Sequence, residues 1–404
     1  MEPKIRFNNN SWQKHKVGEL CDLLTGYPFP GDKILNRGKN LLMRGINITE
    51  GRIRHSDEID RYYNEDTIGL EKYRLQVGDL VIGMDGSKVG KNSALVTSKE
   101  NYSLLVQRVA RLRNEDKNLI NLIQIAVGSD KFIKYVEEMK TSSAIPHISP
   151  ADIRNFPLSL PEDSNERRLV ASYFTSLDSQ ISASTSRLAS LKQMKAASLQ
   201  AMFPQEGETV PKIRFKGFEG EWKKVKFGTL LKECTDKSTS EDEDILLSSA
   251  INGVFLNSEL FGHQRGRSNI GYRKIKRNML ILSAQNLHLG NANVNLRFEH
   301  GLVSPAYKIY DLYNVLPEFM YHWIKREETK KFFLDATTAG ASLCRKNIVW
   351  TDLYKQNILL PKSDTEQQAI ASYFTSLDHQ ISLQSQCLEK LKQIKSACLD
   401  KMFV

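Results

Sequence analysis

The chain has 404 residues, of which 40% are hydrophobic and 26% charged, an ordinary globular composition with room for two or three domains. This excludes a collagen, a disordered tail and a disulfide-stapled miniprotein, and no apolar run approaches the ~18 residues that span a bilayer. The net charge of +10 favours a polyanionic partner. Five cysteines without a CxxC pair, and an N-terminus without the apolar core of a signal peptide, indicate free thiols in a cytoplasmic protein.

The first globular segment, residues 1–160, is predicted to be mixed α/β. The expected elements are strands at 80–82, 93–96 and 104–112 and a helix at 118–139. The Gly-rich stretch after the first strand has some likeness to a phosphate-binding P-loop. However, Asp85 and Asn92 stand where that pattern needs Gly and Ser or Thr. We therefore predict a strand, a turn and a second strand over residues 80–96.

Loops of this first segment carry side chains that suit nucleic acid. Arg and Asn can hydrogen-bond base edges, and Lys contacts phosphates. The candidate DNA-binding residues are Arg44, Asn47, Lys88, Lys91, Asn92, Ser142 and His147. An ordinary solvated surface is the alternative for each of these loops.

A long helix is predicted over residues 161–203. Its apolar side chains recur every three or four residues, which is the spacing of a coiled-coil seam. The seam residues are Phe174, Leu177, Ile181, Leu188 and Leu191. Pro161 stands just before the helix, and neither Gly nor Pro interrupts residues 162–203. About forty residues of helix would be ~60 Å long.

The second globular segment, residues 204–360, is also predicted to be mixed α/β. The expected elements are strands at 245–249, 279–283 and 307–310 and a helix at 317–333. Like the first segment it is moderately basic, with 23 basic and 18 acidic side chains against 24 and 20 in residues 1–160. Nearly all of the positive charge therefore lies in the two globular segments.

A basic loop at 265–277 is the strongest nucleic-acid signal of the second segment, because it holds six basic residues, two glycines and no acid. Two amides that suit adenine edges follow the strand at 279–283. The candidate DNA-binding residues are Arg265, Arg267, Asn269, Tyr272, Arg273, Lys274, Gln285, Asn286, His288, Arg345 and Lys346. The acidic runs Asp57-Glu58 and 241–244 are expected to be solvated.

Residues 361–404 repeat the first helix at an offset of 200 positions. Between 166–203 and 366–403, 21 of 38 positions are identical. The start of each half also echoes the other, with Pro-Lys-Ile-Arg-Phe at 3–7 and 211–215 followed by a tryptophan. The second seam consists of Phe374, Leu377, Ile381, Leu388 and Leu391. The chain is thus a tandem duplication in which the helices stayed alike and the globular segments diverged.

Two like helices can bury their seams against each other. Antiparallel pairing would separate the two globular segments and give the chain a pseudo-twofold internal repeat. The predicted fold is mixed α/β, with domains at 1–160 and 204–360 and helices at 161–203 and 361–404. The alternative is that each helix packs only on its own domain.

Signatures of catalysis and metal binding are not found in the sequence. No GxGxxG motif follows an expected strand, and no Asn/Asp-Pro-Pro-aromatic tetrapeptide of an aminomethyltransferase occurs. The eight histidines show no metal-ligand spacing with a second His or Cys. We predict no catalytic residue and no metal ligand in this chain.

The whole chain resembles the specificity subunit of type I restriction-modification systems. The resemblance is carried by Pro361–Gln367 running into Ile370-Ala371, Phe374 and Leu377-Asp378, by the copy that starts at Pro161, and by stretches 43–48, 78–82 and 301–307. One departure is Arg167-Arg168, where the second copy has two glutamines.

This resemblance implies a non-catalytic subunit. Each target-recognition domain would read one half of a split site in double-stranded DNA, and the paired helices would fix the spacing. Two modification subunits would bind the chain and methylate adenine N6 with S-adenosylmethionine, and motor-nuclease subunits would join them. ATP and Mg would likewise belong to partner subunits.

Two other functions remain open from the sequence. One is a coiled-coil adaptor that does not read DNA, and the other is a stand-alone DNA-modifying enzyme. The adaptor predicts an assembled complex that does not bind DNA or binds it without salt dependence. The enzyme would need a methyl-donor loop or a metal cluster, and the sequence offers neither.

Overall fold

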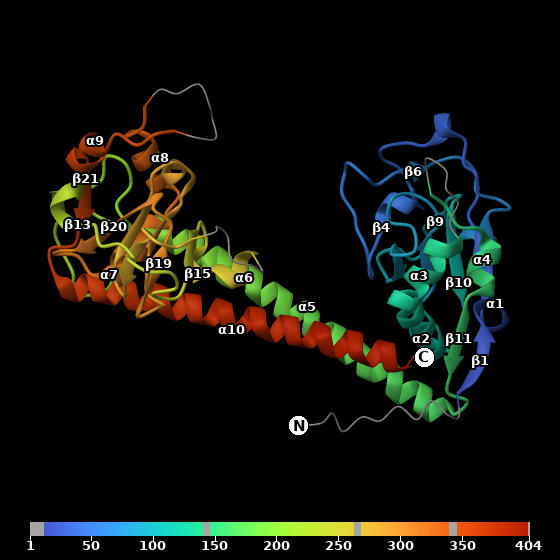
Figure 1. Cartoon of the computed structure of the whole chain (residues 1–404). Helices are drawn as coiled ribbons and strands as arrows, with labels where there is room; N and C mark the ends of the chain where they lie inside the picture. Colours follow the sequence, from blue (N-terminus) through green and yellow to red (C-terminus); the bar gives the residue numbers. More distant parts are fainter. Residues whose placement is uncertain (1–11, 140–145, 262–267, 339–345, 403–404) are drawn as a thin grey trace. The chain divides into compact units, whose positions relative to one another are not determined.

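The computed structural model describes residues 12–139, 146–261, 268–338 and 346–402. The chain divides into two compact units: residues 1–185 and 386–404 form unit 1, and residues 186–385 form unit 2. Each unit combines one globular segment with part of both long helices (Figure 1). The predicted mixed α/β class, with two β-rich domains and two long helices packed together, is confirmed.

Unit 1 is built on an antiparallel sheet with the strand order β2-β10-β7-β8. Its strands are β1 (Gln13–Lys16), β2 (Asp22–Thr25), β3 (Asn40–Met43), β4 (Ile48–Thr49), β5 (Arg52–Ile53), β6 (Tyr62–Tyr63), β7 (Leu80–Gly83), β8 (Ser93–Leu95), β9 (Leu104–Leu105), β10 (Val109–Arg113) and β11 (Pro157–Leu160). Its shorter helices are α1 (Val17–Leu20), η2 (Gly31–Lys33), η3 (Gly45–Asn47), η4 (Glu71–Tyr73), α2 (Lys117–Val127), α3 (Asp130–Met139) and α4 (Pro150–Asn155).

Unit 2 has the same sheet arrangement, with the order β13-β20-β17-β18. Its strands are β12 (Lys223–Lys226), β13 (Leu231–Cys234), β14 (Leu247–Ala250), β15 (Gly253–Leu256), β16 (Arg273–Lys276), β17 (Leu280–Ser283), β18 (Ala292–Val294), β19 (His300–Val303), β20 (Tyr307–Leu312) and β21 (Asn357–Leu360). Its shorter helices are η5 (Phe227–Leu230), α6 (Asn257–Phe261), η6 (Leu287–Leu289), α7 (Pro317–Ile324), α8 (Glu328–Leu334) and α9 (Trp350–Lys355).

Three elements that the sequence predicted as continuous are interrupted. The strand expected at 104–112 is divided into β9 and β10, because Arg108 turns the backbone with a φ of 63°. The helix at 118–139 breaks at Gly128, and Ser129 Oγ accepts a hydrogen bond from the N–H of Phe132 (3.4 Å) at the start of α3. The helix at 317–333 breaks between α7 and α8. The apolar pattern continues across both helix breaks because each pair of helices packs on one core.

One inner strand of each four-stranded sheet, β7 in unit 1 and β17 in unit 2, is buried on both faces. In unit 1, Leu80 and Ile82 of β7 belong to the core that includes α2 and α3, whereas Val81 faces the core formed with Met43 and Ile48. Strand β17 alternates in the same way. This period of two gives near-continuous apolar runs, which is why both strands were predicted correctly.

The long helices are α5 (Ser164–Ala201) and α10 (Asp364–Met402), and they lie side by side in opposite directions (Figure 1). Within unit 1, Lys395 Nζ lies 2.5 Å from Asp178 Oδ1, and Tyr173 Oη lies 3.7 Å from Cys398 Sγ. Within unit 2, the equivalent pairs are Lys195 with Asp378 (2.5 Å) and Ser198 with Tyr373 (3.0 Å). The same helix contacts thus occur once in each unit.

The apolar stripe of each helix serves two neighbours. Phe174 joins the core of unit 1, and Phe374 joins that of unit 2. Further along, Cys398 and Leu399 of α10 pack against the unit 1 core, so the two helices share it. Helix pairing and packing on the domain are therefore both present, because each helix contacts its own domain and the other helix. Of the ten seam residues, Phe174, Leu177, Leu191, Phe374, Leu377 and Leu388 are buried, and Ile181, Leu188, Ile381 and Leu391 are half-buried.

The repeated start of each half touches the repeated helix. Trp12 Nε1 donates to Glu166 Oε1 at 2.9 Å, and Trp222 Nε1 donates to Glu366 Oε1 at 3.2 Å. In unit 2, Arg214 also donates through Nε and Nη2 to both oxygens of Glu366, each at 2.7 Å. Since Glu366 is only 1% exposed, this bidentate pair anchors the segment before β12 to the first turn of α10.

We expect Glu366→Gln to lower the free energy of unfolding by about 3–5 kcal/mol, because it leaves the enclosed Arg214 guanidinium without its counter-charge. Urea denaturation of the full chain measures the change. The control is Glu206→Gln, which removes an exposed carboxylate paired with Lys331 and should leave the unfolding midpoint almost unchanged. Equal midpoints for both variants would contradict the anchoring role of Glu366.

Candidate nucleic-acid interface

In unit 1, three loops meet at the carboxyl end of β7. The N–H of Met84 donates to Arg108 O at 2.9 Å, and the N–H of Ile148 donates to Met84 O at 3.0 Å. Between them, the N–H of Gly86 donates to Pro146 O at 3.1 Å. The turn after β7, the turn before β10 and the segment that contains His147 are therefore joined by backbone hydrogen bonds.

The hairpin formed by β4 and β5 borders the same place. The N–H of Gly51 at its tip donates to Ser93 O at 2.9 Å, next to Asn92. Helix η3, just before the hairpin, also approaches the turn, since a Cβ built on Gly45 would lie 3.5 Å from Asp85 Oδ1. Arg44, the hairpin, the 85–92 turn and His147 thus come together, although they span about a hundred residues of sequence.

We name this region the first surface and define it by its charged and polar members. These are Arg44, Arg52, Arg54, Lys88, Lys91, Arg108 and His147. All are exposed except Arg44, which is half-buried. Burial, followed by the charge of Arg61, lowers the pKa of Arg44, and a guanidinium remains charged at neutral pH even so. Asp85 is held by Arg108 at 3.3 Å, so it does not neutralise the lysines.

The turn that carries Lys88 and Lys91 has a defined backbone. Gly90 has a φ of +86°, and a Cβ placed on it would lie 2.9 Å from Cγ1 of Val136 on α3. Glycine is required there because the backbone is left-handed and packs directly on the helix. The predicted strand, turn and strand over 80–96 are confirmed by the antiparallel pairing of β7 with β8.

In unit 2, the same edge of the sheet gathers a second set of loops. Ser283 at the end of β17 pairs with Tyr307 at the start of β20, and Val303 at the end of β19 pairs with Arg273. The N–H of Ala284 donates to Ala306 O at 3.3 Å, as Met84 does to Arg108 in unit 1. The structure therefore brings four predicted residues to one edge, which we name the second surface: Tyr272, Arg273, Gln285 and Asn286.

The acidic run at 241–244 is largely exposed, as predicted, and it also makes specific contacts. Glu243 forms an ion pair with Lys274, and this hydrogen bond, followed by one from the backbone of Thr239, lowers the pKa of Glu243. Glu241 accepts a hydrogen bond from the N–H of Asn269 at 3.0 Å. The run is mostly exposed, but these acids lie next to the basic segment that follows some thirty residues later. They anchor that segment and neutralise Lys274.

Three predicted residues lie too deep to reach a ligand from this conformation. Asn47 and Asn269 are each 1% exposed and His288 is 8% exposed. The Asn269 amide is bonded to Asp242, through Nδ2 to Oδ1 at 2.6 Å and through Oδ1 to the backbone N–H at 2.8 Å. Asn47 binds Asp60 and the backbone of its own hairpin. These asparagines hold loops in shape instead of facing outward.

The remaining predicted residues are placed as follows. Asn92 is half-buried beside the first surface, and Lys274 is half-buried next to Arg273. Lys346 is half-buried on the segment where Asn347 O accepts a hydrogen bond from Thr338 (3.1 Å). Ser142, Arg265, Arg267 and Arg345 lie outside the residues that the structure describes.

Sequence reasoning missed Arg52, Arg54 and Arg108 of the first surface. Arg52 begins the two-residue strand β5 and Arg54 follows it, and this strand is too short to give a periodic signal, although the alternation Arg-Ile-Arg with Gly51 at the tip is typical of a short hairpin. Arg108 interrupts what the sequence presents as one apolar strand. Its left-handed backbone puts the side chain at the edge, where 62% of it is exposed.

Metal and membrane sites are not seen in the described parts of the chain. Over residues 12–139, 146–261, 268–338 and 346–402, no group of three His, Cys, Asp or Glu side chains is arranged to hold a metal ion. No helix in those ranges has the length and apolar character needed to cross a bilayer.

Comparison with known proteins gives one domain match and one curated relative. Residues 9–193 match the family model of the type I restriction modification DNA specificity domain. The specificity subunit of the type I restriction enzyme EcoAI from Escherichia coli is 29% identical over 161 residues. That alignment covers 39% of this chain and 27% of the relative.

Solved structures match over the whole length at low identity. The S subunit of the type I restriction-modification system of M. genitalium superposes with a TM-score of 0.60 and 16% identity, covering 100% of this chain and 99% of that one. A chain from a type I system, solved to describe complex assembly and conformational transition, gives a TM-score of 0.51 with 16% identity and 97% of each chain covered. These likenesses show the fold.

The duplicated architecture and the matched domain define a DNA specificity protein. Residues 9–193 carry the DNA specificity domain of type I restriction-modification systems, and the chain as a whole has the fold of solved S subunits.

We expect Lys88→Ala combined with Lys91→Ala to weaken DNA binding by the assembled complex and to reduce the salt slope of binding by about 2, because each lysine can neutralise one phosphate. Both are exposed, and among the described residues neither forms an ion pair. Fluorescence anisotropy at several salt concentrations measures the slope. Lys14→Ala, an exposed lysine on β1, is the control, and an equal slope for both variants would exclude the first surface from the interface.

Proposed function

We propose that the chain reads a bipartite sequence in double-stranded DNA, with the first surface on one half-site and the second surface on the other. The observation that carries this proposal is that two sheets of identical strand order present different side chains at the same edge. Lys88 and Arg108 in unit 1 have Gln285-Asn286 and Ala306 at the comparable turns of unit 2. One scaffold with two unlike edges suits two unlike half-sites.

The helix pair is proposed to set the spacing between the half-sites. Helix α5 has 38 residues, which corresponds to about 57 Å, and the half-sites of a bipartite site one DNA turn apart are separated by ~34 Å. Residues 1–160 and 204–360 would be the target-recognition domains, and 161–203 and 361–404 the spacer helices.

The helices are also proposed to dock two identical modification subunits. Packing explains why buried positions stayed identical between the two copies, but it does not explain identity at exposed positions. The exposed identical pairs include Ser172 and Ser372, Thr175 and Thr375, Ser176 and Ser376, and Gln180 and Gln380. Two copies of one partner would require this likeness, because each would contact the same side chains.

A groove in unit 2 supports the docking face. It has a volume of about 430 Å³ and lies between α7 and the first half of α10. Its lining includes Glu318, Gln368, Ser372, Thr375, Ser376 and His379. Three of these side chains, Ser372, Thr375 and Ser376, are among the identical pairs.

Chemistry in the assembled enzyme is proposed to belong to the partners. S-adenosylmethionine would bind the modification subunits, which methylate adenine, and ATP and Mg would serve the motor-nuclease subunits. This chain would contribute sequence recognition and assembly in the cytoplasm.

The test is to map methylated adenines in DNA treated with the modification subunits, with and without this chain. We expect methylation of one bipartite sequence only when the chain is present. Arg273→Ala should relax one letter of one half-site, at a cost of about 1–3 kcal/mol in discrimination, and leave the other half-site unchanged. Methylation by the chain alone would favour a stand-alone enzyme. Assembly without any sequence preference would favour an adaptor.

Docking has its own test in the stoichiometry of the complex. We expect Ser176→Arg to leave one modification subunit bound instead of two, and Ser376→Arg to remove the other, because each places a long cation on one of the two like faces. Native mass spectrometry counts the subunits. The control is Ser190→Arg, an exposed position of α5 where the second copy already has Lys390. Two bound partners in the Ser176→Arg and Ser376→Arg double variant would refute this docking face.

A further inference from the structure

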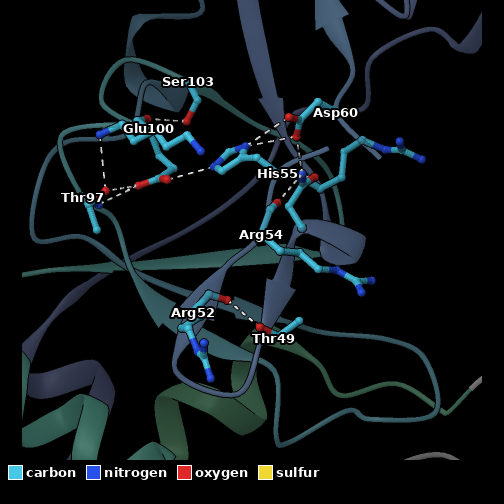
Figure 2. Close-up of polar contacts among 11 residues, drawn as sticks. Thr49, Arg52, Arg54, His55, Asp60, Thr97, Glu100 and Ser103 are labelled. Atoms are coloured by element: carbon cyan, nitrogen blue, oxygen red, sulfur yellow. Dashed lines mark hydrogen bonds and ion pairs between the residues drawn. The ribbon is translucent and has the colours of Figure 1, made fainter. Parts of the chain in front are cut away.

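Beneath the first surface, His55 lies between two carboxylates (Figure 2). Its Nδ1 is 3.1 Å from Asp60 Oδ1 and 3.3 Å from Oδ2, and its Nε2 is 2.9 Å from Glu100 Oε1. The three side chains are largely enclosed, with 10% of His55, 13% of Asp60 and 3% of Glu100 exposed. Each ring nitrogen faces a carboxylate oxygen, so the imidazole ring joins the two acidic side chains.

The Glu100 side of this cluster is fixed by its own hydrogen bonds. The N–H and the hydroxyl of Thr97 donate to Glu100 Oε2 at 2.9 and 2.5 Å, and the hydroxyl of Ser103 donates to Glu100 O at 2.6 Å. Burial acts to raise the pKa of Glu100, but the hydrogen bonds from Thr97 and His55 outweigh it and lower the pKa. Glu100 is therefore ionised at neutral pH and holds His55 from a rigid turn.

The Asp60 side leads to the hairpin of the first surface. Asp60 Oδ1 accepts a hydrogen bond from Asn47 Nδ2 at 2.9 Å. The same nitrogen of Asn47 donates to Arg54 O at 3.3 Å, and Asn47 Oδ1 accepts from the N–H of Arg44 at 3.3 Å. A chain of contacts thus runs from Glu100 through His55, Asp60 and Asn47 to both ends of the segment 44–54.

The segment also has local supports, because Arg54 donates through its N–H to Asn47 O and through Nε to Ile46 O, each at 2.9 Å. Strands β4 and β5 pair over only two residues each, and Thr49 adds one hydrogen bond to Arg52 O (2.9 Å), seen in the lower part of Figure 2. Two paired residues per strand do not hold a hairpin in one conformation in water. Ile48 in the core and the hydrogen bond from Gly51 to Ser93 hold the hairpin itself, and the buried contacts of Asn47 below hold its two ends at Arg44 and Arg54.

We propose that His55 is a positioning residue for sequence reading: it joins Asp60 to Glu100 and thereby holds the 44–54 segment in the conformation that contacts the first half-site. This inference rests on the proposed function, since it assumes that the first surface reads DNA. It assigns part of the specificity to a residue that does not touch the DNA.

The test uses the full chain assembled with its modification subunits and two DNA libraries, one randomised in each half-site. We expect His55→Gln to reduce the preference for the correct letters of the first half-site about tenfold and to leave the second half-site unchanged. The variant keeps the size of the side chain but leaves two enclosed carboxylates around a neutral amide, so Asp60 is no longer held.

The matched rescue is His55→Gln combined with Glu100→Gln. The double variant removes one of the two carboxylates, so the neutral amide at position 55 faces only the negative charge of Asp60. The amide introduced by Glu100→Gln can accept from Thr97 and donate to the amide introduced by His55→Gln, which in turn can donate to Asp60. We expect this double variant to recover most of the lost preference. If His55 acts through this chain of hydrogen bonds, the double variant recovers the preference for the first half-site. If His55→Gln instead unfolds unit 1, the second substitution does not restore that preference.

The controls separate stability from positioning. Ser103→Ala removes a buried hydrogen bond on the far side of Glu100 and should lower the melting temperature without changing the preferred letters. Unchanged letters with His55→Gln, equal losses at both half-sites, or no rescue by the double variant would each overturn the inference. If the Lys88→Ala and Lys91→Ala variant also left DNA binding unchanged, the proposed function itself would fail.

Discussion

The apolar stripe on each long helix is the constraint on which the rest of the molecule depends. Phe174 and Phe374 lie in the cores of units 1 and 2, while neighbouring positions of the same stripe face the other helix. A substitution on the stripe would disturb a domain core and a helix contact together. This double demand accounts for the retention of the stripe in both copies. The exposed side chains of the loops at the sheet edges carry no such double demand and were free to diverge.

The two sheets have the same strand order but different loops at their edges, and different buried contacts hold these loops in place. In unit 1, the hairpin is held from below by the His55 cluster. In unit 2, Lys325 Nζ donates to Ile251 O at 2.7 Å and to Asn293 Oδ1 at 2.6 Å, beneath the turn of the β14–β15 hairpin. Burial, and then the charge of Lys195, lowers the pKa of Lys325 to about 8. Equivalent hairpins are thus fixed by different buried charges, so the surfaces diverged together with their supports.

The strongly periodic parts of this fold could be predicted from the sequence, and the rest depended on tertiary contacts. The helices follow from a repeat over forty residues, and β7 and β17 from apolar runs buried on both faces. Asn47 and Asn269 have amides that suit base edges, but an amide suits a buried backbone equally well, and sequence does not distinguish the two. The pairing of Glu243 with Lys274 crosses thirty residues and appears only once β16 is formed. The location of the candidate residues at strand ends could be predicted from the sequence, but the exposure of each side chain could not.

The two surfaces differ in charge, and on the proposed function this difference assigns them different tasks. Among the described residues, Lys88 and Lys91 give the first surface exposed cations without an acidic partner, whereas the second surface has Arg273 as its one cation and the neighbouring Lys274 is neutralised by Glu243. Attraction to phosphates does not depend on sequence, so the first surface would supply most of the initial affinity. Once it is bound, the second surface searches as part of the same molecule, at a high effective concentration, and needs little charge of its own. The amides of the second surface can then act mainly in selecting bases. A weakly charged surface that binds only when the base sequence matches increases discrimination without increasing non-specific affinity.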